Sequence, residues 1–210
     1  MACAICEIRR PRRFCPGVGG EICTICCGTE REVTVTCPLD CAYLQEARRH
    51  EKPAPPAELP NQDIRVSEEL LQENEDLLFA LATALFRAAA AAPGVVDSDV
   101  RQALEALIRT YRTLESGIYF ETRPANPLAG AVCHAIQQAA GEFRRNEQQR
   151  TGISHTRDAD VLRVLAFLQR YELNVNNGRP RGRAFLDALR GFYPESTGGA
   201  DAPASSIILP

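Results

Sequence analysis

The chain has 210 residues, nine cysteines, no tryptophan and a formal net charge of −3. This length suits one domain or two, and so small a net charge argues neither for nor against an acidic partner. No stretch approaches the roughly 20 apolar residues of a membrane span, so we expect no membrane-spanning segment.

Residues 1–50 form a cysteine-rich segment, which holds eight of the nine cysteines. Its first residues show no apolar run of the kind that a secretory signal needs, and this predicts a cytoplasmic, reducing location. In that environment, closely spaced cysteines bind metal more often than they form disulfides. So small a segment cannot fold on apolar burial alone, and structural zinc would stabilise it by roughly 10–16 kcal/mol.

The spacing of these cysteines is typical of zinc ligands. Two residues between cysteines let the backbone turn back and present both thiolates to one tetrahedral metal. The adjacent Cys26 and Cys27 point in different directions, so they suit different metals. We predict two structural Zn²⁺ ions, the first held by Cys3, Cys6, Cys23 and Cys26 and the second by Cys15, Cys27, Cys37 and Cys41. His50 is an alternative ligand for the second site.

An iron–sulfur cluster also takes four thiolates, and a disulfide or a reactive thiol pair is a further alternative. Zinc is favoured because ferredoxin-like runs of three closely spaced cysteines are absent.

The order of the motifs resembles a known family. After the Cys3–Cys6 pair, Phe14-Cys15-Pro16 followed by Ile22-Cys23 and Cys26 is similar to the treble-clef, cross-braced zinc fingers of the HIT and MYND type. The resemblance covers residues 1–50 and implies a module that binds protein partners. No family is recognised for residues 66–193.

The rest of the chain divides into three parts. Residues 51–65 are predicted to be a stiff, extended linker, because they contain Pro53, Pro55, Pro56 and Pro60. Residues 66–193 show helical periodicity, which predicts an all-α, antiparallel bundle of four or five helices. Residues 194–210 are predicted to be a disordered tail.

The helices of residues 66–193 have recognisable starts. Ser67 caps a helix that continues to Pro93-Gly94. A second helix begins at Asp97-Ser98 and ends at Gly117, and Asn126-Pro127 begins a third. A fourth runs from about residue 158, and a short fifth contains Phe185, Leu186 and Leu189.

Two arginine clusters suggest an alternative function as a nucleic-acid-associated factor: Arg9, Arg10, Arg12 and Arg13, and Arg179, Arg181 and Arg183. Solvated loops are the more common explanation. Residues 1–50 hold seven arginines and six acidic residues, and two Zn(Cys)₄ centres would make the module negative, so it has no general basic field.

No set of residues indicates a reaction, although an enzyme with a site in the helical domain stays an alternative. We therefore expect a non-enzymatic, zinc-binding adapter with a protein partner.

Overall fold

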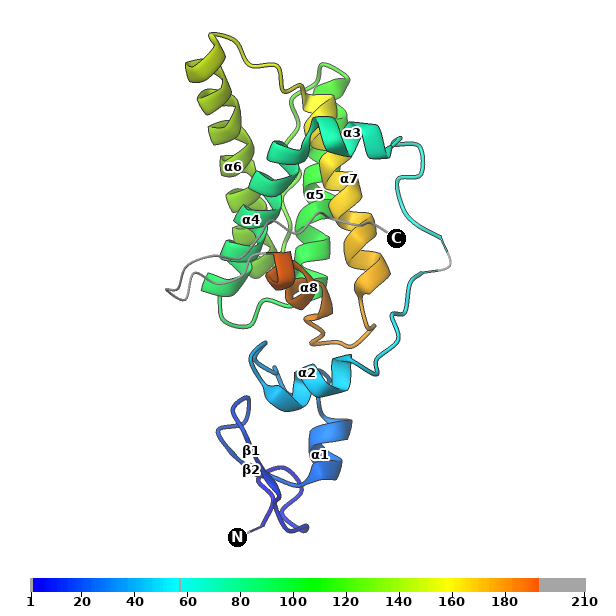
Figure 1. The fold of residues 1–210 in the computed structure, drawn as a ribbon, viewed down its shortest axis with the longest axis vertical. Coiled ribbons are helices and arrows are strands. Elements are labelled where there is room, and N and C mark those ends of the chain that lie inside the picture. The colour runs from blue at the N-terminus through cyan, green and yellow to red at the C-terminus, as the bar shows by residue number, and fades with distance from the viewer. Residues whose placement is uncertain (1, 57, 193–210) are drawn as a thin grey trace.

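The computed structural model describes residues 2–56 and 58–192, and Figure 1 shows its arrangement. The predicted tail, residues 194–210, lies outside the described residues. A small cysteine-rich module lies at one end of the molecule and a helical body makes up the rest (Figure 1). The mostly helical fold with a small N-terminal module is therefore confirmed. No helix in the described part of the chain combines the length and the apolar character that crossing a membrane requires.

The module is built from two very short strands and two short helices. Strand β1 (Arg13–Cys15) pairs antiparallel with β2 (Gly20–Ile22), and helices α1 (Thr24–Thr29) and α2 (Ala42–Arg48) follow. Its buried apolar cluster is formed by only four residues, namely Cys3, Ile22, Cys23 and Cys26. So small a cluster cannot stabilise the module by burial alone.

Six helices form the body: α3 (Glu68–Glu73), α4 (Glu75–Ala91), α5 (Asp97–Glu115), α6 (Pro127–Thr151), α7 (Asp158–Val175) and α8 (Ala184–Phe192). Helix α5 packs against α6 and α7, α4 packs against α6, and α8 contacts α4, α5 and α7. Their apolar stripes meet in one core, in which Leu85, Leu104, Leu165 and Phe185 are fully buried. Each such side chain contributes roughly 1.5–3 kcal/mol when it leaves water.

The predicted helix starts are confirmed, with one correction. The Ser67 hydroxyl accepts a hydrogen bond from the Leu70 N–H (3.3 Å), and the Asn126 side chain accepts one from the Leu128 N–H (3.0 Å). However, the single helix expected from Ser67 is divided at Asn74, which separates α3 from α4. The Asn74 side-chain amide donates to the Leu70 carbonyl (2.9 Å), a local bond that competes with regular helix.

Residues 51–65 form no helix or strand where they are described, and they lie against the body. The Ala54 N–H donates to the Asn176 carbonyl at the end of α7 (2.9 Å). Further along, the Asn61 amide donates to Gln169 of α7 (2.7 Å), and Ile64 is buried in the core of the body. The segment therefore follows the surface of the helical body.

Candidate metal centre

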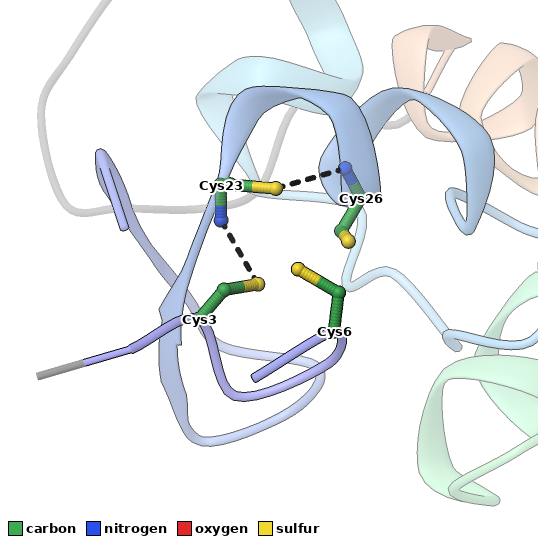
Figure 2. Close-up of side chains that lie close together, drawn as sticks. All are labelled: Cys3, Cys6, Cys23 and Cys26. Carbon is green, nitrogen blue, oxygen red and sulfur yellow. Dashed lines mark hydrogen bonds between the residues drawn. The ribbon is translucent and has the colours of Figure 1, made fainter. Parts of the chain in front are cut away.

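Four cysteines converge in the module. The sulfur atoms of Cys3, Cys6, Cys23 and Cys26 all lie within 4.8 Å of one another, and Figure 2 shows the four side chains pointing toward a common centre. Within residues 2–56 and 58–192, no other three His, Cys, Asp or Glu residues bring ligand atoms together in this way. These four thiol groups could hold one metal ion.

Local backbone structure positions the four sulfur atoms. Cys3 and Cys6 lie in a tight turn, in which the Glu7 N–H donates to the Cys3 carbonyl (2.8 Å). Cys23 caps the N-terminus of α1, where its sulfur accepts a hydrogen bond from the Cys26 N–H (3.4 Å). The Cys23 N–H in turn donates to the sulfur of Cys3 (3.2 Å), as Figure 2 shows. A loop pair and a helix-start pair thus face each other.

The four thiol groups differ in acidity. Burial alone would raise the pKa of Cys3, but hydrogen bonds from the backbone of Cys6, Cys23 and Ile5 outweigh it and hold that pKa at about 6. Burial and hydrogen bonds with the neighbouring sulfur atoms raise the pKa of Cys26 to about 12. Four thiolates this close repel one another, so a cation at their centre would stabilise the fully ionised set.

The cysteines predicted for the second site surround one small cavity. Cys15, Cys27, Cys37 and Cys41 all line a space of about 20 Å³, which is enough for one water-sized particle. Cys37 is buried, and burial raises its pKa, with the nearby charges of Glu32, Cys15 and Cys41 adding to the effect. In this conformation the four sulfur atoms do not converge as closely as those of the first group.

Cys27 faces two arginines. Its sulfur accepts a hydrogen bond from Arg13 Nη1 (3.5 Å) and one from Arg31 Nη2 (3.8 Å). The Arg13 guanidinium also lies 4.0 Å from the centre of the Tyr43 ring. Cys26 and Cys27 are adjacent in α1, but the sulfur of Cys26 lies among the first group of cysteines and the sulfur of Cys27 lies beside two arginines.

His50, the alternative ligand, lies apart from the second group. Its side chain is 79% exposed, its Nε2 is 3.6 Å from a carboxylate oxygen of Glu46, and it does not line the cavity. The remaining cysteine, Cys133, is buried in α6, where burial raises its pKa to about 11.

Several arginines of the two predicted clusters bind other parts of the chain. A hydrogen bond between the Arg9 guanidinium and the sulfur of Cys23 raises the pKa of Arg9, and the charge of Cys6 adds to the effect. Arg179 donates to the Arg31 carbonyl (2.7 Å), and Arg181 donates to the Thr36 hydroxyl (2.9 Å). The second cluster therefore contacts the module.

One functional candidate could not have been found in the sequence. Glu32 is fully buried, and its carboxylate accepts hydrogen bonds from Arg48 of α2 and from the Asn177 side chain. Asn177 follows Glu32 by 145 residues, and no sequence pattern links the two.

Comparisons of the chain with protein-family models, with curated proteins and with solved structures gave no match. The resemblance to HIT and MYND fingers therefore stays a prediction.

Proposed function

We propose that residues 1–50 are a structural module that holds two Zn²⁺ ions, and that the chain is a non-enzymatic adapter whose module binds a protein partner. The observation that carries this proposal is the convergence of Cys3, Cys6, Cys23 and Cys26. In a tetrahedral site with zinc–sulfur bonds of about 2.3 Å, neighbouring sulfur atoms lie about 3.8 Å apart. The sulfur atoms of the four cysteines lie within 4.8 Å of one another, which is close to that spacing. A cluster of several iron atoms needs its thiolates farther apart, so the geometry favours a single ion.

The cavity between Cys15, Cys27, Cys37 and Cys41 supports a second ion. A metal there would draw the four sulfur atoms inward. A zinc ion with four thiolates carries a charge of −2, and the guanidinium groups of Arg13 and Arg31 beside Cys27 would offset it.

Exposed apolar side chains on the module support a protein partner. Ile8, Phe14 and Ile25 are 87%, 57% and 53% exposed. Aromatic side chains such as Phe14 are enriched in surfaces that bind other proteins. The arginines that contact the chain itself have fewer donors left for phosphate groups, which favours a protein over a nucleic acid.

Elemental analysis of the full chain, purified without added metal, tests the metal content. We expect two zinc ions per chain. Abundant iron with visible absorbance, or a chain without metal, would overturn the proposal.

The partner surface is tested with a Phe14→Ser, Ile25→Ser double variant. We expect this variant to keep two zinc ions and to lose a partner that the wild-type chain captures. A Phe79→Ser variant is the matched control, because Phe79 is exposed to a similar degree (58%) on the helical body. Equal capture by all three proteins would contradict a partner surface on the module.

A further inference from the structure

The module and the helical body meet around a buried carboxylate. Glu32 has no exposed surface, and its side chain accepts hydrogen bonds from Arg48 (2.7 Å), from the Asn177 amide (2.8 Å) and from the Arg183 N–H (2.9 Å). Its backbone carbonyl accepts a fourth hydrogen bond, from the Arg181 N–H (2.8 Å). Because a buried charge is costly unless it is paired, these partners fix where Glu32 can lie.

The partners of Glu32 belong to both parts of the molecule. Arg48 ends α2 of the module and also pairs with Asp187 of α8. Asn177, Arg181 and Arg183 belong to residues 176–183, the loop that joins α7 to α8. Figure 1 places this end of the body next to α2. Glu32 therefore joins the module to the body.

Glu32 also lies in the segment that joins two of the candidate ligands, Cys27 and Cys37. Its neighbour Arg31 contacts one of them directly, because the Arg31 guanidinium donates to the sulfur of Cys27 (3.8 Å). The Arg31 carbonyl accepts a hydrogen bond from Arg179 of the 176–183 loop (2.7 Å). Arg31 and Glu32 thus connect a candidate ligand on one side with the loop on the other.

The conformation of Glu32 depends on this surrounding structure. Its φ angle is +53°, in the left-handed region that residues with a side chain rarely adopt. Such a conformation persists only where neighbouring contacts hold it. The Glu32 N–H donates to the Val35 carbonyl (3.2 Å) within a local turn, the buried carboxylate is bound by its partners in the body, and the cysteines lie at each end of the segment.

We propose that Glu32 couples the second metal centre to the helical body, so that metal bound by Cys15, Cys27, Cys37 and Cys41 holds the 176–183 loop closed. This inference rests on the proposed second zinc ion. When that ion leaves, the two cysteines no longer hold the ends of the segment between Cys27 and Cys37. Glu32 then moves out of its left-handed conformation, and the N–H groups of Arg181 and Arg183 lose the hydrogen bonds that they donate to Glu32.

Amide hydrogen exchange on the full chain tests the coupling. The N–H groups of Arg181 and Arg183 both donate to Glu32, whereas the Gly182 N–H between them donates to Arg179 within the loop and serves as an internal control. After chelation of the metal, we expect Arg181 and Arg183 to exchange at least about tenfold faster, because each N–H loses its hydrogen bond to Glu32, that of Arg181 to the backbone carbonyl and that of Arg183 to the buried carboxylate. Helices α5 and α6 should keep their protection.

Two variants separate coupling from metal binding. Glu32→Gln keeps all eight cysteines but removes the charge of the buried carboxylate, so we expect it to retain two zinc ions while Arg183, whose N–H donates to this side chain, exchanges as fast as in the chelated wild-type chain. Glu30→Gln is the matched control, since Glu30 lies in the same loop region and contacts only nearby residues. It should behave as wild type in both measurements.

The outcomes distinguish the two proposals. If chelation removes two zinc ions and the exchange of Arg181 and Arg183 is unchanged, the coupling is wrong and the two-zinc module stands. If the wild-type chain holds a single zinc ion that is lost in Cys26→Ser and kept in Cys27→Ser, the second centre fails and the coupling fails with it.

Discussion

At the scale of single residues, the two adjacent cysteines of α1 decide how many metal ions the module can hold. Cys26 is buried beside Cys3, Cys6 and Cys23, whereas the sulfur of Cys27 contacts Arg13 and Arg31. A helix turns about 100° per residue, so neighbouring side chains cannot reach the same tetrahedral centre easily. One short helix can therefore serve two centres.

Serine substitutions at these two positions should affect different centres. We expect Cys26→Ser and Cys27→Ser each to retain about one tightly held zinc ion, because removing a thiolate takes away part of the roughly 10–16 kcal/mol that a structural site supplies. Elemental analysis gives the number of ions. Alkylation followed by mass spectrometry then shows which cysteines have become reactive, Cys3, Cys6 and Cys23 in the first variant and Cys15, Cys37 and Cys41 in the second.

Cys133→Ser provides the control for these variants, because Cys133 lies in α6, far along the chain from both groups. It should keep two zinc ions. Two zinc ions at full affinity in both test variants would contradict the assignment of Cys26 and Cys27 to separate centres.

The sequence indicates the cysteine ligands better than it indicates Glu32. A C-x2-C spacing predicts convergence because the two thiolates are brought together by one local turn. The role of Glu32 depends on Asn177 and Arg183, which reach it only once the whole body has folded. Among the six acidic residues of the module, nothing in the local sequence marks this one as buried.

At the scale of elements, one carboxylate joins two helices of the body. Asp97 is the first residue of α5, and its side chain accepts hydrogen bonds from the N–H groups of Phe185 (2.9 Å) and Leu186 (3.3 Å) near the start of α8. Burial raises the pKa of Asp97 to about 7, in spite of these two hydrogen bonds. The residue thus fixes α8 against α5.

This raised pKa predicts a pH dependence. A carboxyl group whose pKa is higher in the folded chain than in the unfolded chain, where it is near 3.9, favours folding at low pH. That contribution is lost as the pH rises from about 4 to about 7. We expect Asp97→Asn, which cannot ionise, to gain stability relative to wild type over this range, by up to a few kcal/mol. Urea unfolding followed by helical circular dichroism at several pH values measures this difference.

Comparing the two proteins at each pH removes the effect of metal release, which both share. A constant difference between their free energies of unfolding from pH 4 to pH 7 would contradict a raised pKa for Asp97.

Helix starts could be predicted and helix interruptions could not. Ser67, Asn126 and Pro127 act within one turn of their own helix, so the local sequence suffices. Asn74 interrupts a pattern that is apolar on both sides, and only the structure shows its amide bonded to the Leu70 carbonyl. The prolines of residues 51–65 predict an extended backbone, but the burial of Ile64 depends on the distant helices that surround it.

At the scale of the whole molecule, the two parts are stabilised in different ways. The body has a large apolar core shared by α4, α5, α6, α7 and α8, while the buried apolar cluster of the module consists largely of cysteines. The contact between the parts includes the polar groups of Glu32 and Arg48 and the side chain of Leu39, which packs against the core of the body. Metal should therefore determine whether the module folds and have little effect on the body.

Chelation of the full chain should leave the helical signal nearly intact. Only α1 and α2, with 6 and 7 residues, belong to the module. We expect far-ultraviolet circular dichroism to change little when a strong chelator is added, while the cysteines of residues 1–50 become reactive to alkylation. A collapse of the helical signal would mean that the body depends on the module for its stability. Re-addition of zinc should reverse the alkylation.

Residues 51–65 join the module to the body, so any separation of the two parts would be intramolecular. The segment leaves α2 next to the lower end of the body and reaches α3 at the opposite end (Figure 1). If it detached, its 15 residues would tether the module within a radius of about 50 Å. A tether of this length keeps the module at a local concentration on the order of millimolar. The binding of the module to the body is then independent of the protein's concentration. Any other molecule that binds the same end of the body must compete with the tethered module, which stays at this local concentration.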